Sequence, residues 1–569
     1  MLRAVSVFVG SVLTLVGSYA VAATPDAGSI LQQLQQEKRL SQPLPKFERK
    51  TQEEPALVDD PAALKVLLKK FTFVDNKNIT TDELTEAFAR YLDTEQTFNG
   101  LQKIARMVGE YYRGKGLWAK AVLPAQSLEG GELILQIIEG KLGEVEIEHK
   151  EEELNFPEDK SRQFLLEGQI EGEVFSIEAF QRAIKNLDAV PGVTAAAILR
   201  PGKQEGQTDV LVRMANTPAT AGSVRIDNHG GRATSWEQMR LTGLLNIDSP
   251  FKLGEQINLQ VVHSRGTDVF TAGFSHPWGT DGSRFGANKT FVRYELGEPL
   301  QAIEGKGDAQ TTTVYLQKPL VQNNEAVLTS RFELSHNEYF NETIAGVSSD
   351  KVADLLTATF SASWPDQYGG NATNSANVTF TAGDIDLGGA PANLIADASA
   401  AGTQGNFNKL SLQASRLQEL NPSTQLWLSF LGQVSDKNLD SGQKMSLGGP
   451  SAIRAYPGGE GSGDHGALMT LELRHSIAND AQVMLYYDHG WTRQNHSTWS
   501  GWNSGSTTPN TYELKGLGVG LKIQAAQDTE VVALLASRLG QNPSADANGK
   551  DSDGTEYETR AWFSIVKQF

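Results

Sequence analysis

The sequence predicts a β-barrel membrane protein, in which a sixteen-stranded antiparallel outer-membrane barrel follows an N-terminal helix and two small α/β domains. Three observations lead to this prediction. The N-terminus reads as an export signal, the next part of the chain repeats a β-α-α-β-β pattern, and the remainder consists of long alternating strands with no helical signal. A length of 569 residues is sufficient for several such domains.

The composition excludes several classes of protein. With 50 basic and 68 acidic residues the net charge is -18, which argues against nucleic acid as a partner. The chain is 39% hydrophobic and 21% charged, too polar for a bundle of membrane helices. The absence of cysteine excludes disulfides, thiolate metal sites and cysteine nucleophiles.

Residues 1–22 read as a secretory signal peptide. A positive charge at Arg3 precedes an apolar stretch over residues 4–16, and small residues lead to a cleavage site near Ala22. The alternative is a retained membrane anchor. Because no other segment approaches 18 consecutive apolar residues, the mature chain is expected to be soluble or to cross a membrane as β-structure.

Residues 23–40 and 41–63 form the next two segments. Ile30, Leu31 and Leu34 recur at helical spacing, which predicts a short helix over residues 26–40 that cannot be stable alone. A disordered leader is the alternative. Four prolines and mixed charges over residues 41–63 predict an extended linker.

Residues 64–142 and 143–218 repeat one β-α-α-β-β order. Thr80 with Glu83 predicts a capping box, and Ser176 is the expected N-cap of a later helix. Two copies of one pattern predict two small domains, each with helices covering a sheet. The expected strands are 65–74, 119–122, 132–138, 142–148, 194–199 and 208–213, and the helices begin near 80, 98, 158 and 177, with Leu84, Phe88 and Leu92 as the apolar stripe of the first.

Residues 219–569 carry the sixteen candidate strands of the barrel. Ile257 and Leu259 fall on one face and Asn258 on the other, as expected where lipid-facing and lumen-facing residues alternate. A soluble β-sandwich also alternates, but its strands usually have about five or six residues. The candidate strands are 223–229, 237–247, 255–264, 269–277, 286–296, 309–319, 327–340, 353–364, 372–385, 407–419, 423–435, 466–477, 480–491, 512–523, 528–539 and 557–569.

The chain ends on Phe569. Phe563, Ile565 and Phe569 share one face of the last expected strand, which Lys567 interrupts. We interpret the terminal aromatic residue as a signal for outer-membrane insertion, so outer-membrane lipid and, during biogenesis, the barrel-assembly machinery are expected partners.

Two stretches of the small domains resemble a known family. Residues 112–147 carry a progression of Tyr, Gly, Pro-x-Gln, Gly and Glu-Gly, and residues 187–214 carry a Pro-Gly-Val break and a Pro-Gly turn. With them the chain resembles the outer-membrane transporters of two-partner secretion (TpsB), which include hemolysin, filamentous-hemagglutinin and contact-dependent-inhibition exporters. The resemblance covers essentially the whole mature chain and implies two periplasmic polypeptide-transport-associated (POTRA) domains and a plug helix at 23–40. The matched positions are Tyr112, Gly116, Pro124, Gln126, Gly131, Glu139, Gly140, Pro191, Gly192, Val193, Pro201, Gly202 and Gly206.

Two further segments resemble the family's sixth loop and thirteenth strand. The loop tip reads Ile-Arg454-Ala455-Tyr456, and the strand carries an aromatic-x-Asp488-x-Gly490 element. Asp488 is expected to point into the lumen, where Arg454 could meet it as a bidentate fork with a structural or gating role. The alternatives are a solvated loop arginine and a lumen-lining carboxylate. Because Ala455 replaces the usual glycine, we expect a slight difference in the tip backbone.

No enzymatic chemistry is predicted. The sequence lacks a phosphate loop, a dinucleotide motif before a helix and an H-E-x-x-H motif, and His489 falls on the strand face opposite Asp488. We therefore expect no catalytic, cofactor-binding or metal-binding residues, although an acid, a histidine and a serine near the outer rim would leave a barrel hydrolase open.

The resemblance implies a protein exporter in the outer membrane of a Gram-negative bacterium, expected to be monomeric. The POTRA domains would capture one unfolded secreted protein, an adhesin, cytolysin or growth-inhibition toxin, which would add a strand to an exposed sheet edge or lie in a groove beside a helix. The barrel would conduct it without nucleotide. Two alternatives stay open. A barrel-assembly insertase usually has more POTRA domains and no N-terminal helix, and a passive porin needs no periplasmic domains.

Overall fold

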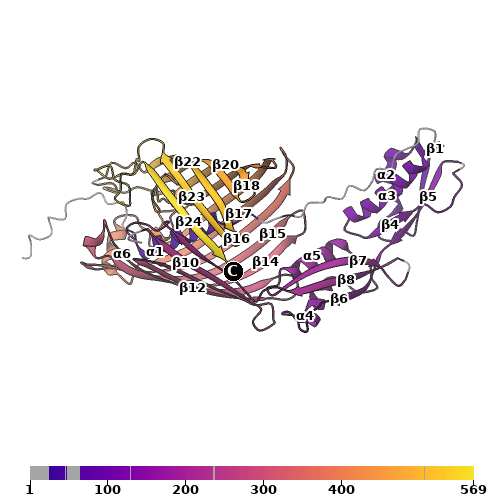
Figure 1. The fold of residues 1–569 in the computed structure, drawn as a ribbon, viewed down its shortest axis with the longest axis horizontal. Coiled ribbons are helices and arrows are strands. Elements are labelled where there is room, and N and C mark those ends of the chain that lie inside the picture. Colours follow the sequence, from indigo (N-terminus) through magenta and orange to yellow (C-terminus); the bar gives the residue numbers. More distant parts are fainter. Residues whose placement is uncertain are drawn as a thin grey trace, which may run out of the picture.

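The computed structural model describes residues 25–44, 47, 65–128, 130–204, 206–234, 238–504 and 506–569. The expected signal peptide and most of the expected linker lie outside these residues. A large barrel carries two small domains in a row at one of its ends (Figure 1). Among the described helices, none has the length and apolarity needed to cross a membrane.

The first small domain packs helices on a three-stranded sheet of order β2-β5-β4. Its helix α2 begins after Thr80, whose side chain accepts a hydrogen bond from the Glu83 amide at 3.3 Å. The buried residues of both helices and the sheet form one core. The elements are β1 (Lys65–Leu68), β2 (Lys70–Val74), α2 (Thr81–Phe88), β3 (Thr94–Thr97), α3 (Phe98–Gly114), β4 (Ala119–Val122) and β5 (Glu132–Glu139).

One part of this domain differs from the expectation. The single strand expected over residues 65–74 is two strands, and β1 pairs with the unforeseen strand β3. Helix α2 ends at Phe88, so Leu92 does not belong to its stripe. Asp93 adopts a positive φ of 57°, which turns the chain back toward β1. The short polar sequence of β3 lacks the apolar alternation by which a strand is recognised.

Several positions of the family motif make structural hydrogen bonds in this domain. The buried Tyr112 phenol donates a hydrogen bond of 3.1 Å to the Glu139 carboxylate. Burial, together with that carboxylate, raises the pKa of Tyr112, so the phenol remains a neutral donor. The Gln126 amide hydrogen-bonds both the N–H and the C=O of Ile134, each at 2.8 Å. These contacts fix α3 and the segment before β5 to the sheet.

The second small domain has a sheet of order β6-β8-β7. Ser176 caps helix α5 by accepting a hydrogen bond from the Ala179 amide at 3.2 Å. Backbone hydrogen bonds from Trp118 N to Phe175 O and from Phe175 N to Gly140 O join the two small domains. The elements are β6 (Lys141–Glu148), α4 (Glu158–Leu165), α5 (Ile177–Asp188), β7 (Val193–Pro201) and β8 (Gln207–Asn216).

The described residues after 219 form a closed barrel of sixteen antiparallel strands, and each overlaps one of the expected strands. The first and last strands of the barrel pair with each other and so close the sheet, with Ser564 opposite Asp227 and Gln568 opposite Ser223. The strands are β9 (Thr220–Asp227), β10 (Arg240–Asp248), β11 (Gln256–Ser264), β12 (Thr267–Pro277), β13 (Arg284–Glu295), β14 (Lys306–Gln322), β15 (Val327–Thr343), β16 (Gly346–Asp366), β17 (Ala372–Asp386), β18 (Gly405–Asn421), β19 (Thr424–Ser435), β20 (His465–Ala478), β21 (Ala481–Arg493), β22 (Thr511–Ala526), β23 (Thr529–Arg538) and β24 (Thr559–Gln568).

The outer wall of the barrel is apolar and exposed. Large hydrophobic side chains such as Phe332, Leu356 and Leu485 face outward, while their neighbours along each strand face the lumen. This alternation fits a wall that contacts lipid. At the end of the chain, the backbone of Phe569 exchanges hydrogen bonds of 2.9 and 3.0 Å with Gly222 and so completes the barrel seam.

Candidate functional site

The long loop over residues 436–464, between β19 and β20, folds into the barrel. Its residues Leu447, Ile453 and Tyr456 are buried against Tyr486 of β21 and Leu514 of β22. Glycines at positive φ allow the loop to turn tightly, as at Gly461 with φ 68°. This packing places the loop tip against the lumen wall.

Arg454 and Asp488 meet at this wall. Arg454 Nε lies 2.9 Å from Asp488 Oδ2 and Arg454 Nη2 lies 2.9 Å from Asp488 Oδ1, a bidentate pair. The backbone N–H of Arg454 also donates to Asp488 at 3.2 Å. Asp488 is fully buried, so water does not screen the pair.

Three more residues complete the environment of Arg454. Nη1 contacts the Glu472 carboxylate at 2.7 Å, and the guanidinium lies 3.3 Å from the centre of the Tyr486 ring. The Trp562 indole donates to the Arg454 carbonyl oxygen at 2.7 Å. Sequence reasoning missed Glu472 and Trp562. The alternation of residues along their strands places both side chains in the lumen. This was a usable signal, since a lone lumen-facing carboxylate needs a partner.

Tyr456 and Gly490 lie beside the ion pair without joining it. Tyr456 packs in the apolar cluster of the loop. A Cβ on Gly490 would lie 2.7 Å from Ile453 Cδ1, so a larger residue here would require the buried Ile453 side chain, or the loop tip that carries it, to shift. Ala455 does not adopt a positive φ. It faces Gly516, and a Cβ added to Gly516 would lie 2.8 Å from the Cβ of Ala455. The backbone at Ala455 therefore does not need the positive φ that alanine tolerates poorly.

The expected N-terminal helix forms as α1 (Ala27–Leu40) and lies inside the barrel (Figure 1). Asp26 caps it, accepting a hydrogen bond from the Ser29 amide at 2.8 Å. Ile30 and Leu31 are buried against wall residues that include Tyr294 and Phe407. The helix that cannot be stable alone thus gains its stability from the lumen wall.

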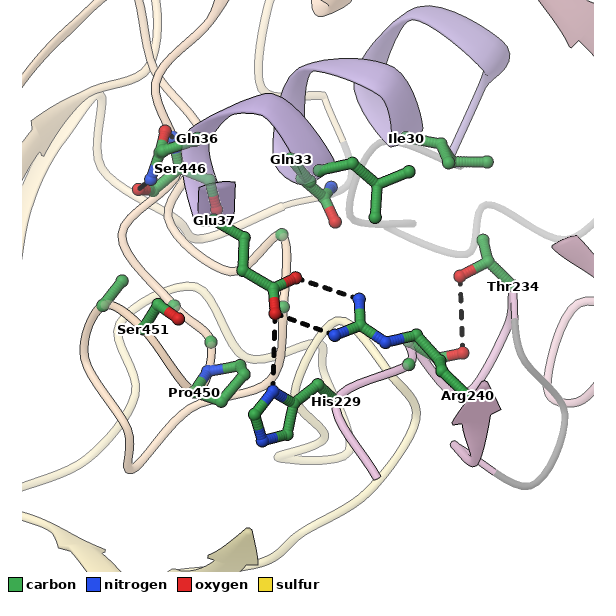
Figure 2. A pocket seen from close by; sticks show the side chains of 18 of the residues that line it. Ile30, Gln33, Gln36, Glu37, His229, Thr234, Arg240, Ser446, Pro450 and Ser451 are labelled. Carbon is green, nitrogen blue, oxygen red and sulfur yellow. Dashed lines mark hydrogen bonds and ion pairs between the residues drawn. The ribbon is translucent and has the colours of Figure 1, made fainter. Parts of the chain in front are cut away.

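Each end of α1 is held by a cation of the wall. The Glu37 carboxylate accepts hydrogen bonds from Arg240 Nη1 at 2.9 Å and Nη2 at 2.8 Å, and His229 Nδ1 lies 3.4 Å away. These contacts are drawn in Figure 2. At the other end, Lys351 Nζ lies 3.1 Å from the Asp26 carboxylate. Sequence reasoning identified none of these contacts, because the partners come from segments distant in the chain.

The helix also contacts the inserted loop. Gln36 donates to the Ser446 carbonyl at 2.6 Å and accepts from the Ser446 amide at 3.1 Å. Gly28 packs against Gly442, where a Cβ would lie 3.1 Å from the Gly442 Cα. A cavity of about 80 Å³ between helix and loop is lined by Gln33, Glu37, Arg240 and neighbouring residues (Figure 2). Within the described ranges, no three His, Asp or Glu side chains cluster as metal ligands do.

Comparisons with known proteins identify the family. Residues 206–523 match the family of the haemolysin secretion/activation proteins ShlB/FhaC/HecB, and residues 66–140 match the ShlB-type POTRA domain. The chain belongs to this family. Its members are two-partner secretion transporters of the outer membrane, whose POTRA domains are periplasmic, and the chain accordingly translocates a partner exoprotein.

Relatives and a solved structure agree with the family. The chain is 25% identical to the heme/hemopexin transporter protein HuxB of Haemophilus influenzae, over 96% of this chain and 95% of that one. It is 27% identical to the outer membrane transporter CdiB of Dickeya dadantii, over 71% and 72%. The structure of CdiB from Escherichia coli superimposes with a TM-score of 0.73 at 19% identity, covering 96% of this chain and all of that chain, and shares the fold.

Proposed function

We propose that the two POTRA domains capture the unfolded exoprotein and that the barrel lumen conducts it after α1 has left as a plug. The observation that carries this proposal is the position of α1, which lies in the lumen and contacts the wall through side chains at both of its ends. The Arg454–Asp488 pair would hold the inserted loop during transport as a lock. Removing residues 26–40 should raise single-channel conductance, and unchanged conductance would contradict the plug.

The free edge of β7 is the proposed capture site. β7 is an outer strand of its sheet, and residues 196–201 are exposed. The Ala195 N–H points away from β8, because it donates to the Asp188 side chain at 2.8 Å, and alternation then turns the Leu199 N–H the same way. An extended segment could add a strand there.

The opposite edge of this sheet is covered. Gly172 donates to the Leu142 carbonyl at 2.7 Å, and Arg162 Nη1 donates to the Val145 carbonyl at 2.6 Å, so two backbone acceptors of β6 are already occupied. An arriving segment would find fewer backbone partners along β6 than along β7.

Cross-linking tests the capture site directly. The chain has no cysteine, so Leu199→Cys introduces a single thiol on the β7 edge. We expect this variant to form a cross-link with the exoprotein during secretion. Asp159→Cys, on the exposed surface of α4, is the matched control and should form none. Equal labelling at both positions would argue against capture at β7.

The exoprotein would be an adhesin, a cytolysin or a growth-inhibition toxin. The similarity to a heme/hemopexin transporter extends over nearly the whole chain, so a heme- or hemopexin-related exoprotein joins these candidates. Folding of the exoprotein at the cell surface would supply direction, because no nucleotide motif is present. Translocation in liposomes that requires added nucleotide would contradict this source of direction.

Depletion of the protein distinguishes the exporter from its rivals. Loss of one large secreted protein is expected for an exporter, whereas general loss of outer-membrane barrels would indicate an insertase. A porin would keep its activity after deletion of residues 64–215. We further propose that the transporter acts as a monomer and reaches the membrane through the barrel-assembly machinery, with Phe569 as its insertion signal.

A further inference from the structure

Both wall cations that hold α1 have a second carboxylate that does not belong to α1. We propose that these carboxylates, Asp227 and Asp440, are release counter-ions, positioning residues that keep Arg240 and Lys351 paired after the helix has left. The inference rests on the proposed role of α1 as a plug and adds what makes its departure reversible.

The first arrangement lies at the Glu37 end of the helix. Arg240 Nε contacts Asp227 Oδ1 at 2.8 Å and Nη2 contacts Oδ2 at 3.3 Å, while Nη1 and Nη2 also reach Glu37 (Figure 2 shows the Glu37 contacts). Asp227 is completely buried, and 9% of Arg240 is exposed. One guanidinium therefore serves two carboxylates, one from the plug and one from strand β9.

The second arrangement repeats the first at the Asp26 end. Lys351 Nζ contacts the two oxygens of Asp440 at 2.7 and 3.0 Å and Asp26 at 3.1 Å. Lys351 is a buried residue of β16, whereas Asp440 belongs to the inserted loop. Two unrelated segments thus supply the same combination of a wall cation, a plug carboxylate and a resident carboxylate.

The physical consequence concerns the open state. Removing the sole partner of a buried charge is costly, since the charge is left without water or counter-ion. With Asp227 and Asp440 in place, the departure of α1 leaves each cation with a carboxylate. In the closed state, two carboxylates on one cation also repel each other, which weakens the hold on the helix.

The contact of the loop tip is built differently. Within the described residues, Asp488 forms an ion pair with Arg454 alone, and its other side-chain contact is the Thr470 hydroxyl at 3.0 Å. Withdrawal of Arg454 would leave a buried carboxylate without a cation. The same lumen therefore holds two contacts suited to release and one suited to remain.

Single-channel recording of the full-length protein in planar bilayers tests the inference. Asp227→Asn and Asp440→Asn keep a side-chain oxygen but remove the resident charge. Each should lower the open probability by about tenfold, because the open state would then contain a buried cation without a carboxylate partner. Glu37→Gln should raise it. Asp248→Asn is the matched control. Asp248 lies on β10 like Arg240, accepts a hydrogen bond from Gln256 and, among the residues that the structure describes, forms no hydrogen bond or ion pair with α1.

Effects of opposite sign separate this role from a structural one. If Asp227→Asn and Asp440→Asn both leave the open probability unchanged, or raise it as Glu37→Gln does, the inference is overturned. Should one variant fail to assemble, as judged by heat-modifiable mobility, the other decides the question, since the two residues lie in different segments. Deleting residues 26–40 distinguishes the two proposals. If the deletion leaves conductance unchanged, the plug itself is refuted. If the deletion raises conductance but the two aspartate variants leave the open probability unchanged, only the counter-ion proposal is refuted.

Discussion

The Trp562 indole donates a 2.7 Å hydrogen bond to the carbonyl oxygen of Arg454, 108 positions earlier in the chain. Trp562 lies on β24, the strand that closes the barrel against β9. One side chain therefore joins barrel closure to the position of the inserted loop.

Trp562→Phe should weaken this connection. The substitution keeps an aromatic ring but leaves the buried Arg454 carbonyl without its donor, which costs about 1–3 kcal/mol. Urea unfolding of the purified barrel measures the loss. Phe563→Leu on the lipid face of the same strand is the control, and equal stability of both variants would show that the indole N–H contributes nothing.

Asp488→Asn should destabilise the folded loop strongly. Breaking a buried ion pair by removing one partner typically costs about 3–5 kcal/mol. Arg454→Lys should reduce secretion as well, because lysine keeps the charge but cannot form the bidentate contact. A double-mutant cycle with Arg454→Gln measures the coupling, and strictly additive effects would contradict a direct lock.

Gly490→Ala should displace the loop tip from β21. The new Cβ would lie 2.7 Å from Ile453 Cδ1 and 2.9 Å from Leu447 Cδ2. Both side chains are fully buried and have little room to shift, so we expect the loop that carries them to move. We expect reduced secretion and a lower unfolding midpoint. Gly243→Ala is the control, because a Cβ there meets nothing within 4 Å, and similar behaviour of both variants would remove the steric explanation.

Much of the fold could be predicted from the sequence. The sixteen barrel strands are long and alternate between polar and apolar residues, and both properties are local. Strand β3 was missed because its four residues are polar and owe their conformation to pairing with β1. Sequence periodicity also predicted α1, but it does not reveal which surface buries Ile30 and Leu31.

The candidate site was predictable only in part. Arg454 and Asp488 stood out because they lie in motifs that resemble a family. Glu472 and the cations Arg240 and Lys351 lie in strands without such motifs, and their partners come from loops or from α1. Such contacts depend on how the loop and the helix enter the lumen, which no short stretch of sequence specifies.

Phe569→Ala should reduce the amount of barrel in the outer membrane without much effect on the stability of the assembled fraction. The Phe569 side chain is 64% exposed, so little packing is lost, and the backbone pairing with Gly222 is unaffected. Immunoblotting of membrane fractions and urea unfolding of the purified protein separate the two effects. A normal membrane level would argue against an insertion signal.

The path of the exoprotein is tested most directly by a pair of adjacent cysteine substitutions on β18. Ser411 alternates with the lipid-facing Leu410, which is 45% exposed, and so faces the lumen. During secretion, Ser411→Cys should cross-link to the exoprotein and Leu410→Cys should not. Cross-linking from Leu410→Cys alone, or from neither position while secretion proceeds, would contradict transport through the lumen.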